Sequence, residues 1–371
     1  MASGCRTFAR QVTAVAVGTA LAPLSAAPVT CASRRGEGEV RNVELRGVTR
    51  EQLASAARDA LGARRRLEAV RRIAGGSKKG VYRLVMDDAT TAIAYLWDDA
   101  ENYWPAAEGD DDLTDPFSPG LGLDLFEAAH ARLDALGVRV PAIRLVDRDG
   151  SHCPADLAIV EDLPGENLEQ LLARDPRAAA PVMARLGEAL ETMRRHRAPR
   201  YGKVAVVDAG GTSRGTSCEG VVLERALRDL AEAASRDPRI AAARDRLEER
   251  LLRLAAAVQP RTEYAVVHGE LGPDHVLVDP DGNPVAIDIE GTMYFDVEWE
   301  HVFLQIRLHD AYQPLAVDAL DEDRLALYML AQRLSLTAGP LRLLDGDFPD
   351  RSFMAGIAEH NLKQALELIR T

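Results

Sequence analysis

The chain has 371 residues and a mass of 40.3 kDa, which is more than one ordinary core of about 100–200 residues requires. Hydrophobic residues make up 47% and charged residues 28% of it, a composition that excludes disordered and fibrous classes. Asp and Glu number 58 against 45 Lys and Arg, so the formal net charge is −13, and we expect no binding to nucleic acid or to an anionic membrane.

The first 40 residues differ from the rest of the chain. Arg6 and Arg10 precede an apolar stretch at residues 12–24, and small residues follow it, which is the order of a secretory signal. The stretch is shorter than the roughly 20 apolar residues of a membrane span. Two interpretations stay open for residues 1–40, a disordered tail, which we favour, and a signal-like segment.

Residues 41–163 are predicted to form a small lobe rich in β-structure. Its hydrophobic periodicity indicates helices at residues 49–61 and 121–136 and strands at residues 67–73, 80–86, 90–97, 142–146 and 157–161. Residues 98–120 are acidic and contain three prolines, so we expect a loop there.

Residues 164–371 are predicted to form a larger, mostly helical lobe, with a hinge at residues 161–165. Helices are expected at residues 166–173, 178–195 and 218–258, the last broken near Pro238, and again over the last 70 or so residues. Three short strands are expected at residues 264–267, 276–279 and 285–289. The sequence therefore predicts an α+β protein of two lobes.

A glycine-bearing turn joins the first two predicted strands. It contains Gly75, Gly76, Ser77 and Lys78 and is closed by Gly80. Glycines let backbone N–H groups approach phosphate oxygens because no Cβ intervenes. A plain hairpin turn is the alternative, since the pattern is weak on its own.

Two acidic motifs follow strands in the second lobe. V-V-H-G-E-L-G-P-D-H, at residues 266–275, places Glu270 in a loop with His275 five residues later, and V-A-I-D-I-E-G, at residues 285–291, ends a strand with Asp288 and Glu290. Phosphoryl transfer needs a carboxylate near the attacking hydroxyl, and acidic or amide ligands that hold Mg²⁺ against the nucleotide phosphates. A hairpin with Glu270 on one arm and Asp288 on the other predicts such a site.

These motifs, H-G-E-x-x-x-x-H and then I-D-I-E-G at strand spacing, resemble the aminoglycoside phosphotransferase family and its protein-kinase-like relatives over roughly residues 65–310. The resemblance implies a bilobal protein-kinase-like fold, with ATP and Mg²⁺ as cofactors. It implies that His268 and Glu270 are catalytic and that Asp288 binds the metal. His275 and Glu290 are the further candidate metal ligands.

The same resemblance covers the smaller lobe. Glu127, on helix 121–136, is similar to the structural glutamate of the family, and Glu161 lies in a segment similar to the hinge whose backbone holds adenine. Glu127, Glu161 and the glycine-bearing turn, Gly75 to Lys78, are therefore expected to form the nucleotide site.

The chain departs from the family's pattern at three positions. Glu270 stands in place of an Asp, His275 in place of a metal-binding Asn, and Tyr95 in place of the Lys or Arg that pairs with the phosphates. An imidazole is an unusual ligand for Mg²⁺, which prefers oxygen, and the neighbouring Asp274 offers an oxygen instead. Lys78 and Lys79 are candidates for the missing cation, and Arg83 is the alternative. For the two lysines we slightly favour the interpretation that they are solvated turn residues.

The sequence thus supports two hypotheses of function. The first is an ATP-dependent phosphotransferase that acts on a hydroxyl group of a small molecule, such as an aminoglycoside-like antibiotic or a metabolite. In this hypothesis Asp296, Glu298 and Glu300 line the acceptor cleft; the alternative is that these three are ordinary acids at the start of a helix. The second is a kinase-like pseudoenzyme that binds a nucleotide or a partner without efficient transfer. Four scattered cysteines without a C-x-x-C pair indicate a reducing compartment, so we expect a cytoplasmic protein.

Overall fold

The computed structural model describes residues 45–73, 76–106 and 111–370. The predicted tail at residues 1–40 and Gly75 lie outside these residues. Within them, no helix combines the length and the apolar character needed to cross a bilayer.

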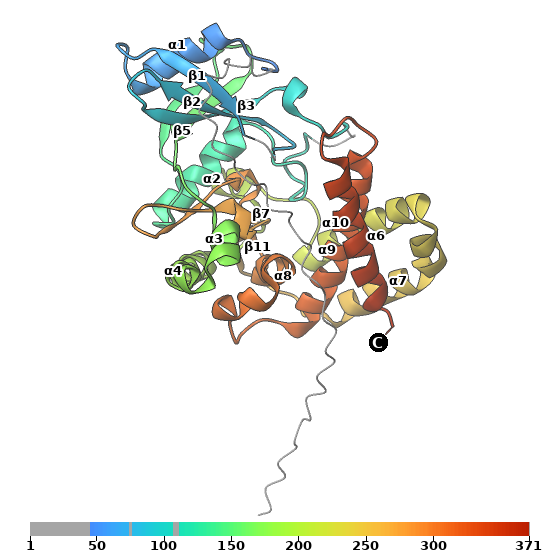
Figure 1. Ribbon diagram of the computed structural model, residues 1–371. Helices are drawn as coiled ribbons and strands as arrows, with labels where there is room; N and C mark the ends of the chain where they lie inside the picture. Colours follow the sequence, from blue (N-terminus) through green and yellow to red (C-terminus); the bar gives the residue numbers. More distant parts are fainter. Residues whose placement is uncertain (1–44, 74–75, 107–110, 371) are drawn as a thin grey trace, which may run out of the picture. The chain divides into compact units, whose positions relative to one another are not determined.

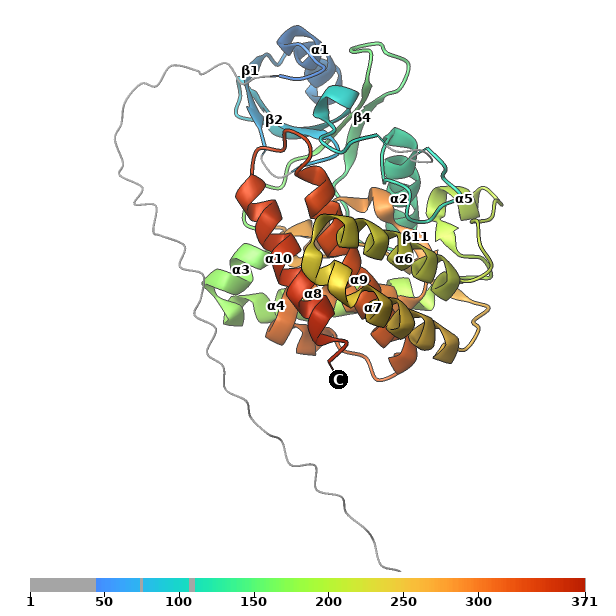
Figure 2. The same cartoon turned by 90° about the vertical axis from the view of Figure 1, so that its right-hand side faces the viewer.

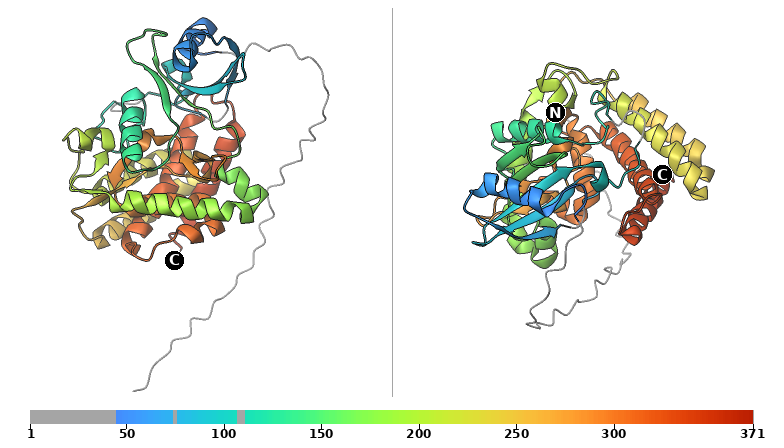
Figure 3. Two further views of the ribbon diagram at one scale, coloured as in Figure 1. Left: turned by 90° about the vertical axis from the view of Figure 1, so that its left-hand side faces the viewer. Right: turned by 90° about the horizontal axis from the view of Figure 1, so that it is seen from above.

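An antiparallel sheet of five strands, in the order β1-β2-β3-β5-β4, forms the smaller lobe (Figure 1). Helix α1 lies across its strands (Figure 3), and its N-cap Thr49 forms a capping box with Gln52. The elements are α1 (Arg50–Leu61), β1 (Leu67–Arg72), β2 (Gly80–Met86), β3 (Thr91–Trp97), η1 (Asp99–Glu101), α2 (Leu123–Ala135), β4 (Ile143–Asp147) and β5 (Asp156–Glu161).

The strand period of two decides which side chains of β3 meet which helix. Ala92, Ala94 and Leu96 join the hydrophobic cluster beneath α1. Ile93 and Tyr95 point to the opposite face and join the core that contains α2 and the second lobe. Tyr95 therefore faces the rest of the molecule rather than solvent.

Helices dominate the second lobe, and α6, α7, α9 and α10 pack side by side (Figure 2). Pro238, with Asp237 as N-cap, divides the predicted helix 218–258 into two helices. The helices are α3 (Leu168–Arg174), α4 (Pro176–Arg195), α5 (Val204–Asp208), α6 (Cys218–Arg236), α7 (Pro238–Ala257), α8 (Val297–Leu308), α9 (Glu322–Leu343) and α10 (Arg351–Glu367), with 3₁₀ turns η2 (Pro273–His275), η3 (Ile289–Gly291) and η4 (His309–Leu315).

Two small sheets position the acidic motifs. One is the hairpin of β9 and β10, and the other has the order β6-β8-β11-β7. The sequence analysis missed β6, β7 and β11, whose two or three residues are too few to show a period. Their bounds are β6 (Arg197–Ala198), β7 (Gly202–Lys203), β8 (Tyr264–Val267), β9 (Val276–Val278), β10 (Pro284–Ala286) and β11 (Met293–Phe295).

The predicted strand at residues 285–289 is too long at its end. β10 stops at Ala286, and Asp288 adopts the left-handed conformation with φ 60° and ψ 44°. This conformation costs an L-residue about 1 kcal/mol, although Asp tolerates it better than most residues. The two-lobed α+β architecture itself is confirmed, whereas the boundary at residues 163–164 stays a prediction.

Candidate active site

One cleft is lined by the turn between β1 and β2 and by the loops on either side of the β9–β10 hairpin. Its lining residues are Lys78, Lys79, Gly120, His268, Glu270, Asp288, Glu290 and Gly291. Six of the residues singled out from the sequence therefore meet here, namely Lys78, Lys79, His268, Glu270, Asp288 and Glu290. Lys79 and Glu290, which meet in the cleft, are 211 residues apart in the chain.

Glycine is required at two positions of the turn. A Cβ on Gly76 would lie 2.9 Å from the carbonyl oxygen of Lys79, and a Cβ on Gly80 would lie 2.7 Å from the carboxyl carbon of Glu101. Neither distance is compatible with a side chain, so the two glycines let the turn fold tightly.

Two aromatic residues hold the turn in place. The backbone N–H of Tyr103 donates to the carbonyl oxygen of Ser77 at 2.9 Å, and Nε1 of Trp104 donates to the Oγ of Ser77 at 3.0 Å. The Tyr103 ring packs against Phe348, just before α10, with centroids 5.5 Å apart. The predicted contact of Ser77 with a nucleotide stays a prediction, and its hydroxyl already has a protein partner.

Lys79 contradicts the interpretation of a solvated turn residue, because it is only 8% exposed. Its Nζ donates to Oδ1 of Asp288 at 2.7 Å and to Oε1 of Glu290, and it lies 5.0 Å from the centre of the Tyr95 ring. Burial alone would lower the pKa of Lys79, but the two carboxylates raise it above its ordinary value. The lysine therefore stays charged at neutral pH.

Glu270 is exposed at the mouth of the cleft. The Lys78 ammonium, which is its main electrostatic partner, lowers the pKa of the Glu270 carboxyl, and Arg225 and His275 act in the same direction. Glu270 is thus ionised at neutral pH and is able to accept a hydrogen bond from a hydroxyl group, although it is a weak base.

Asp288 carries the carboxylate best placed for a metal ion, with a side chain that is 46% exposed. The Lys79 ammonium holds its pKa well below the ordinary value. His275 donates from Nδ1 to the carbonyl oxygen of Glu270 at 2.9 Å, which leaves its Nε2 facing Oδ2 of Asp288 at 3.8 Å. Metal-bound histidines commonly make this backbone hydrogen bond with their other nitrogen.

The donor set fits Mg²⁺, which is held by one or two carboxylates together with phosphate oxygens and water. Nowhere in residues 45–73, 76–106 and 111–370 do three or more His, Cys, Asp or Glu side chains gather as a complete metal centre. Asp288 and His275 stay predicted ligands. Glu290 is buried and engaged by Lys79, so it is the least available of the three predicted ligands.

His268 lines the cleft, is almost fully buried and positions the loop that carries Glu270. It is buried, and its Nε2 donates to the carbonyl oxygen of Ile287 at 2.9 Å, which ties the Glu270 loop to the residue before Asp288. From α8, Glu300 accepts the backbone N–H groups of His268 and Gly269, and Nε1 of Trp299 donates to the Gly269 carbonyl oxygen at 3.1 Å. These contacts give His268 a positioning role, and its predicted catalytic role stays a prediction.

The acids at the start of α8 are not part of a substrate surface. Asp296, Glu298 and Glu300 are all buried. The guanidinium of Arg261 donates to both carboxylate oxygens of Glu298, at 2.8 and 3.0 Å, and Arg324 donates to Asp296 at 2.7 Å. The expectation that these acids line an acceptor cleft is wrong, because they are buried. Arginines from neighbouring segments neutralise Asp296 and Glu298, and Glu300 holds the backbone of the loop before Glu270.

Glu127 and Glu161 lie outside the cleft. Glu127 pairs with Arg148 rather than with a lysine of the cleft, since α2 presents that side of the helix to the residues after β4. Glu161 accepts from Arg139 at 2.7 and 2.8 Å, and although burial would raise its pKa, Arg139 lowers it overall. The Glu127 carboxylate is thus paired with Arg148, whereas the resemblance assigns adenine to the backbone of the segment that contains Glu161, and that assignment stays a prediction.

Arg83, the alternative phosphate-binding cation, is committed elsewhere. Its Nε lies 2.7 Å from Oδ2 of Asp162, a buried carboxylate at the end of β5. This ion pair ties β2 to the predicted hinge. Within the described part of the chain, Lys78 and Lys79 are therefore the cations that line the cleft.

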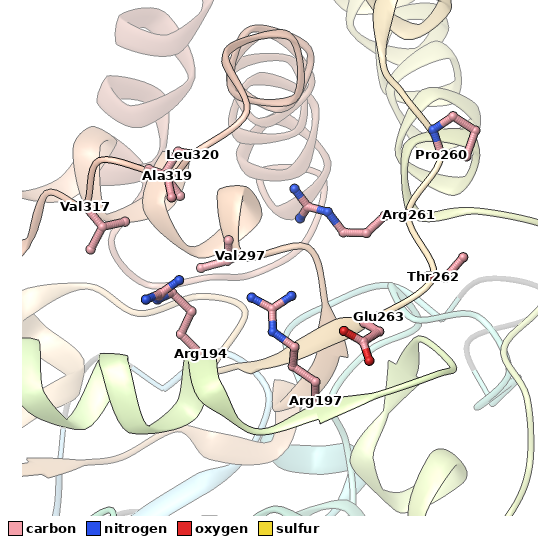
Figure 4. Close-up of a pocket in the computed structure, with 10 residues that line it drawn as sticks. All are labelled: Arg194, Arg197, Pro260, Arg261, Thr262, Glu263, Val297, Val317, Ala319 and Leu320. Carbon is pink, nitrogen blue, oxygen red and sulfur yellow. The ribbon is translucent and has the colours of Figure 1, made fainter.

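A second, larger pocket of about 290 Å³ lies near the end of α4 and the loop before β8 (Figure 4). Arg194, Arg197 and Arg261 line it, but Arg194 pairs with Glu191 and Arg261 with Glu298. None of the predicted site residues lines this pocket, and its charges are largely compensated. The smaller cleft is therefore the candidate active site.

Comparison with solved structures agrees with this architecture. A thermostable mutant of the aminoglycoside phosphotransferase APH(4)-Ia, in a ternary complex with AMP-PNP and hygromycin B, aligns with a TM-score of 0.53 at 15% identity, over 84% of this chain and 98% of that one. The choline kinase LicA from Streptococcus pneumoniae aligns with a TM-score of 0.54 at 14% identity, over 86% of this chain and 97% of that one. At such low identity these likenesses show the fold alone.

Comparison of the sequence with curated proteins gives no match. Residues 115–334, more than half of the chain, match the APH phosphotransferase enzyme family. The match includes both acidic motifs and every residue of the cleft except the two lysines of the turn. The chain belongs to the phosphotransferase enzyme family.

Proposed function

We propose that the protein transfers the γ-phosphate of ATP to a hydroxyl group of a small molecule. The observation that carries the proposal is the convergence of Glu270 and Asp288 on one cleft beneath a glycine-bearing turn. Family membership supports a small-molecule phosphotransferase. The solved complexes of similar fold contain AMP-PNP or AMP, which supports a nucleotide as the donor.

In this proposal the chain supplies position and charge more than covalent chemistry, since phosphoryl transfer asks little of a base. Glu270 accepts a hydrogen bond from the acceptor hydroxyl and orients it. Asp288, with His275 beside it, would hold Mg²⁺, which supplies charge neutralisation for the phosphate oxygens when bound. His268, tied to Ile287, keeps the two loops in register.

The acceptor is proposed to be a neutral or anionic hydroxyl compound, in the class of metabolites rather than polycationic amino sugars. The acids that favoured a cationic acceptor are buried in ion pairs. Lys78 and Arg225 act on Glu270 as positive charges, and Asp288 acts on it as a negative charge. With the acids of α8 inside ion pairs, the observation that favoured a cationic acceptor is removed.

A direct test incubates the protein with ATP, Mg²⁺ and a panel of hydroxyl compounds that are neutral, anionic or polycationic. Mass spectrometry then detects phosphorylated products, and Asp288→Asn serves as the matched inactive control. Transfer to a neutral or anionic compound that is absent in the control supports the proposal. Nucleotide binding without transfer to any class contradicts it.

A second candidate is the pseudoenzyme, and one contact favours it. The Lys79 ammonium bridges Asp288 and Glu290, so a built-in cation already lies between two acids of the cleft. If that ammonium replaces the metal ion, nucleotide affinity will not depend on Mg²⁺. Titration of ATP by calorimetry, with Mg²⁺ and with EDTA, separates the two candidates.

A further inference from the structure

We propose that Lys79 is the phosphate-positioning cation of the cleft and that Glu290 is the positioning residue that holds it, rather than a metal ligand. This inference deepens the proposed function and rests on it. It gives a role to a buried ion pair that neither hypothesis drawn from the sequence used.

The sheet register explains why Lys79 reaches this place. Val81 of β2 pairs directly with Tyr95 of β3, so the start of β2 lies beside this part of β3. Lys79 is in the bend immediately before β2, and its ammonium lies over the Tyr95 ring. A cation delivered from the start of β2 therefore enters the space in front of β3, where Tyr95 itself carries no charge.

The surroundings of Lys79 are those of a prepared binding group. A lysine that is 8% exposed has lost most of its hydration, and such a charge is retained only when it is paired. Glu290 is equally buried, at 4% exposure, whereas Asp288 is half exposed. The lysine is thus anchored by Glu290 on its protein side and turns toward the open cleft on the side of Asp288.

The charge of the cleft agrees with this division of roles. Two lysines face three carboxylates among its lining residues, which leaves one net negative charge when His268 is neutral. One divalent ion reverses that sign, and a triphosphate then meets a positive cleft. If Glu290 were a metal ligand instead, Lys79 would lose its buried partner.

Equilibrium binding by calorimetry tests the assignment, with three ligands measured for each variant: ATP with Mg²⁺, ATP in EDTA, and adenosine. Lys79→Met should weaken ATP binding by at least about tenfold, both with Mg²⁺ and in EDTA, because a charged hydrogen bond to phosphate is lost. Adenosine has no phosphate, so its affinity should stay unchanged and report an intact fold. Lys363 is an exposed residue of α10, so Lys363→Met is the matched control and should change none of the three affinities.

Glu290→Gln distinguishes the positioning role from metal binding. A positioning role predicts weaker ATP binding with Mg²⁺ and in EDTA alike, with Glu290→Asp restoring part of the loss. A loss seen only with Mg²⁺ would make Glu290 a metal ligand and overturn the inference. Unchanged or tighter ATP binding by Lys79→Met would overturn it as well, while wild-type protein that binds no ATP would refute the proposed function itself.

Discussion

Asp296→Asn tests whether the acids before and within α8 are structural. The carboxylate of Asp296 is fully buried and accepts hydrogen bonds from Nε of Arg324 at 2.7 Å and from the hydroxyl of Tyr328 at 2.6 Å. It also lies 3.2 Å from the Arg261 guanidinium. The amide keeps the size of the side chain and removes its charge, so Arg324, which is 1% exposed, loses its closest counter-ion.

The expected loss follows from the burial of the partner that remains. Breaking a buried ion pair by removing one member costs about 3–5 kcal/mol. Arg324 keeps a weaker contact with Asp321 at 3.3 Å, so we expect the lower end, about 3 kcal/mol. With an unfolding entropy of about 2.1 cal/mol/K per residue over roughly 320 residues, that loss lowers the melting temperature by about 4–5 °C.

Thermal unfolding followed by circular dichroism measures the shift. Glu322→Gln is the matched control, because Glu322 is an exposed acid in the first turn of α9 and its loss should change stability by less than about 0.5 kcal/mol. If Asp296→Asn melted with the wild type and weakened only acceptor binding, Asp296 would belong to the substrate cleft and the argument from burial would fail.

Three further predictions concern the cleft and its surroundings. Glu270→Gln should lower turnover at least about a hundredfold with little change in ATP affinity, because a neutral amide accepts a hydrogen bond from the acceptor hydroxyl more weakly than a carboxylate and takes up no proton. Steady-state kinetics that show equal losses in turnover and in ATP affinity would contradict this. Asp288→Asn should abolish transfer and shift the melting temperature by less than about 2 °C, since the side chain is half exposed; a folded variant that still transfers phosphate removes Asp288 from the site. Burial lowers the pKa of Lys203 from 10.5 to about 8, so between pH 8 and 10 the unfolded chain holds a proton that the folded chain has released. Stability contributed by this residue therefore rises with pH over that window, by about 2 kcal/mol, and denaturant titrations of Lys203→Met should show a flatter pH dependence than those of the wild type.

Local sequence patterns were sufficient to predict the fold and about half of the candidate site. Glu270 and Asp288 were predictable because each follows a strand at a fixed spacing, and a hairpin brings such positions together whatever lies around them. The start of the first helix followed from its N-cap Thr49, and the break in the predicted helix 218–258 followed from Pro238. These features depend on residues a few positions apart, and a single sequence displays them directly.

The failures share a different origin, because each depended on a partner far along the chain. Glu127 is drawn to Arg148, and Glu298 to Arg261, 37 residues earlier. The chain contains many arginines and many acidic residues, and their spacing in the sequence does not indicate which arginine pairs with a given acid. The pairing is decided by tertiary packing, so the sequence alone could not show that Glu127 pairs with Arg148 or that Glu298 is buried against Arg261.

The position of Lys79 near Tyr95 could have been predicted from the pairing of two strands. Once strands 80–86 and 90–97 are paired in register, Val81 opposes Tyr95, and the bend immediately before β2 brings the Lys79 ammonium over the Tyr95 ring. The chemistry of the cleft requires positive charge at a point in space, and two neighbouring strands can each deliver it there. An uncharged residue on one strand therefore does not show that the cleft lacks a cation, because the neighbouring strand can supply one at the same register. By that argument Tyr95 counts against catalysis only if Lys79 fails to bind phosphate.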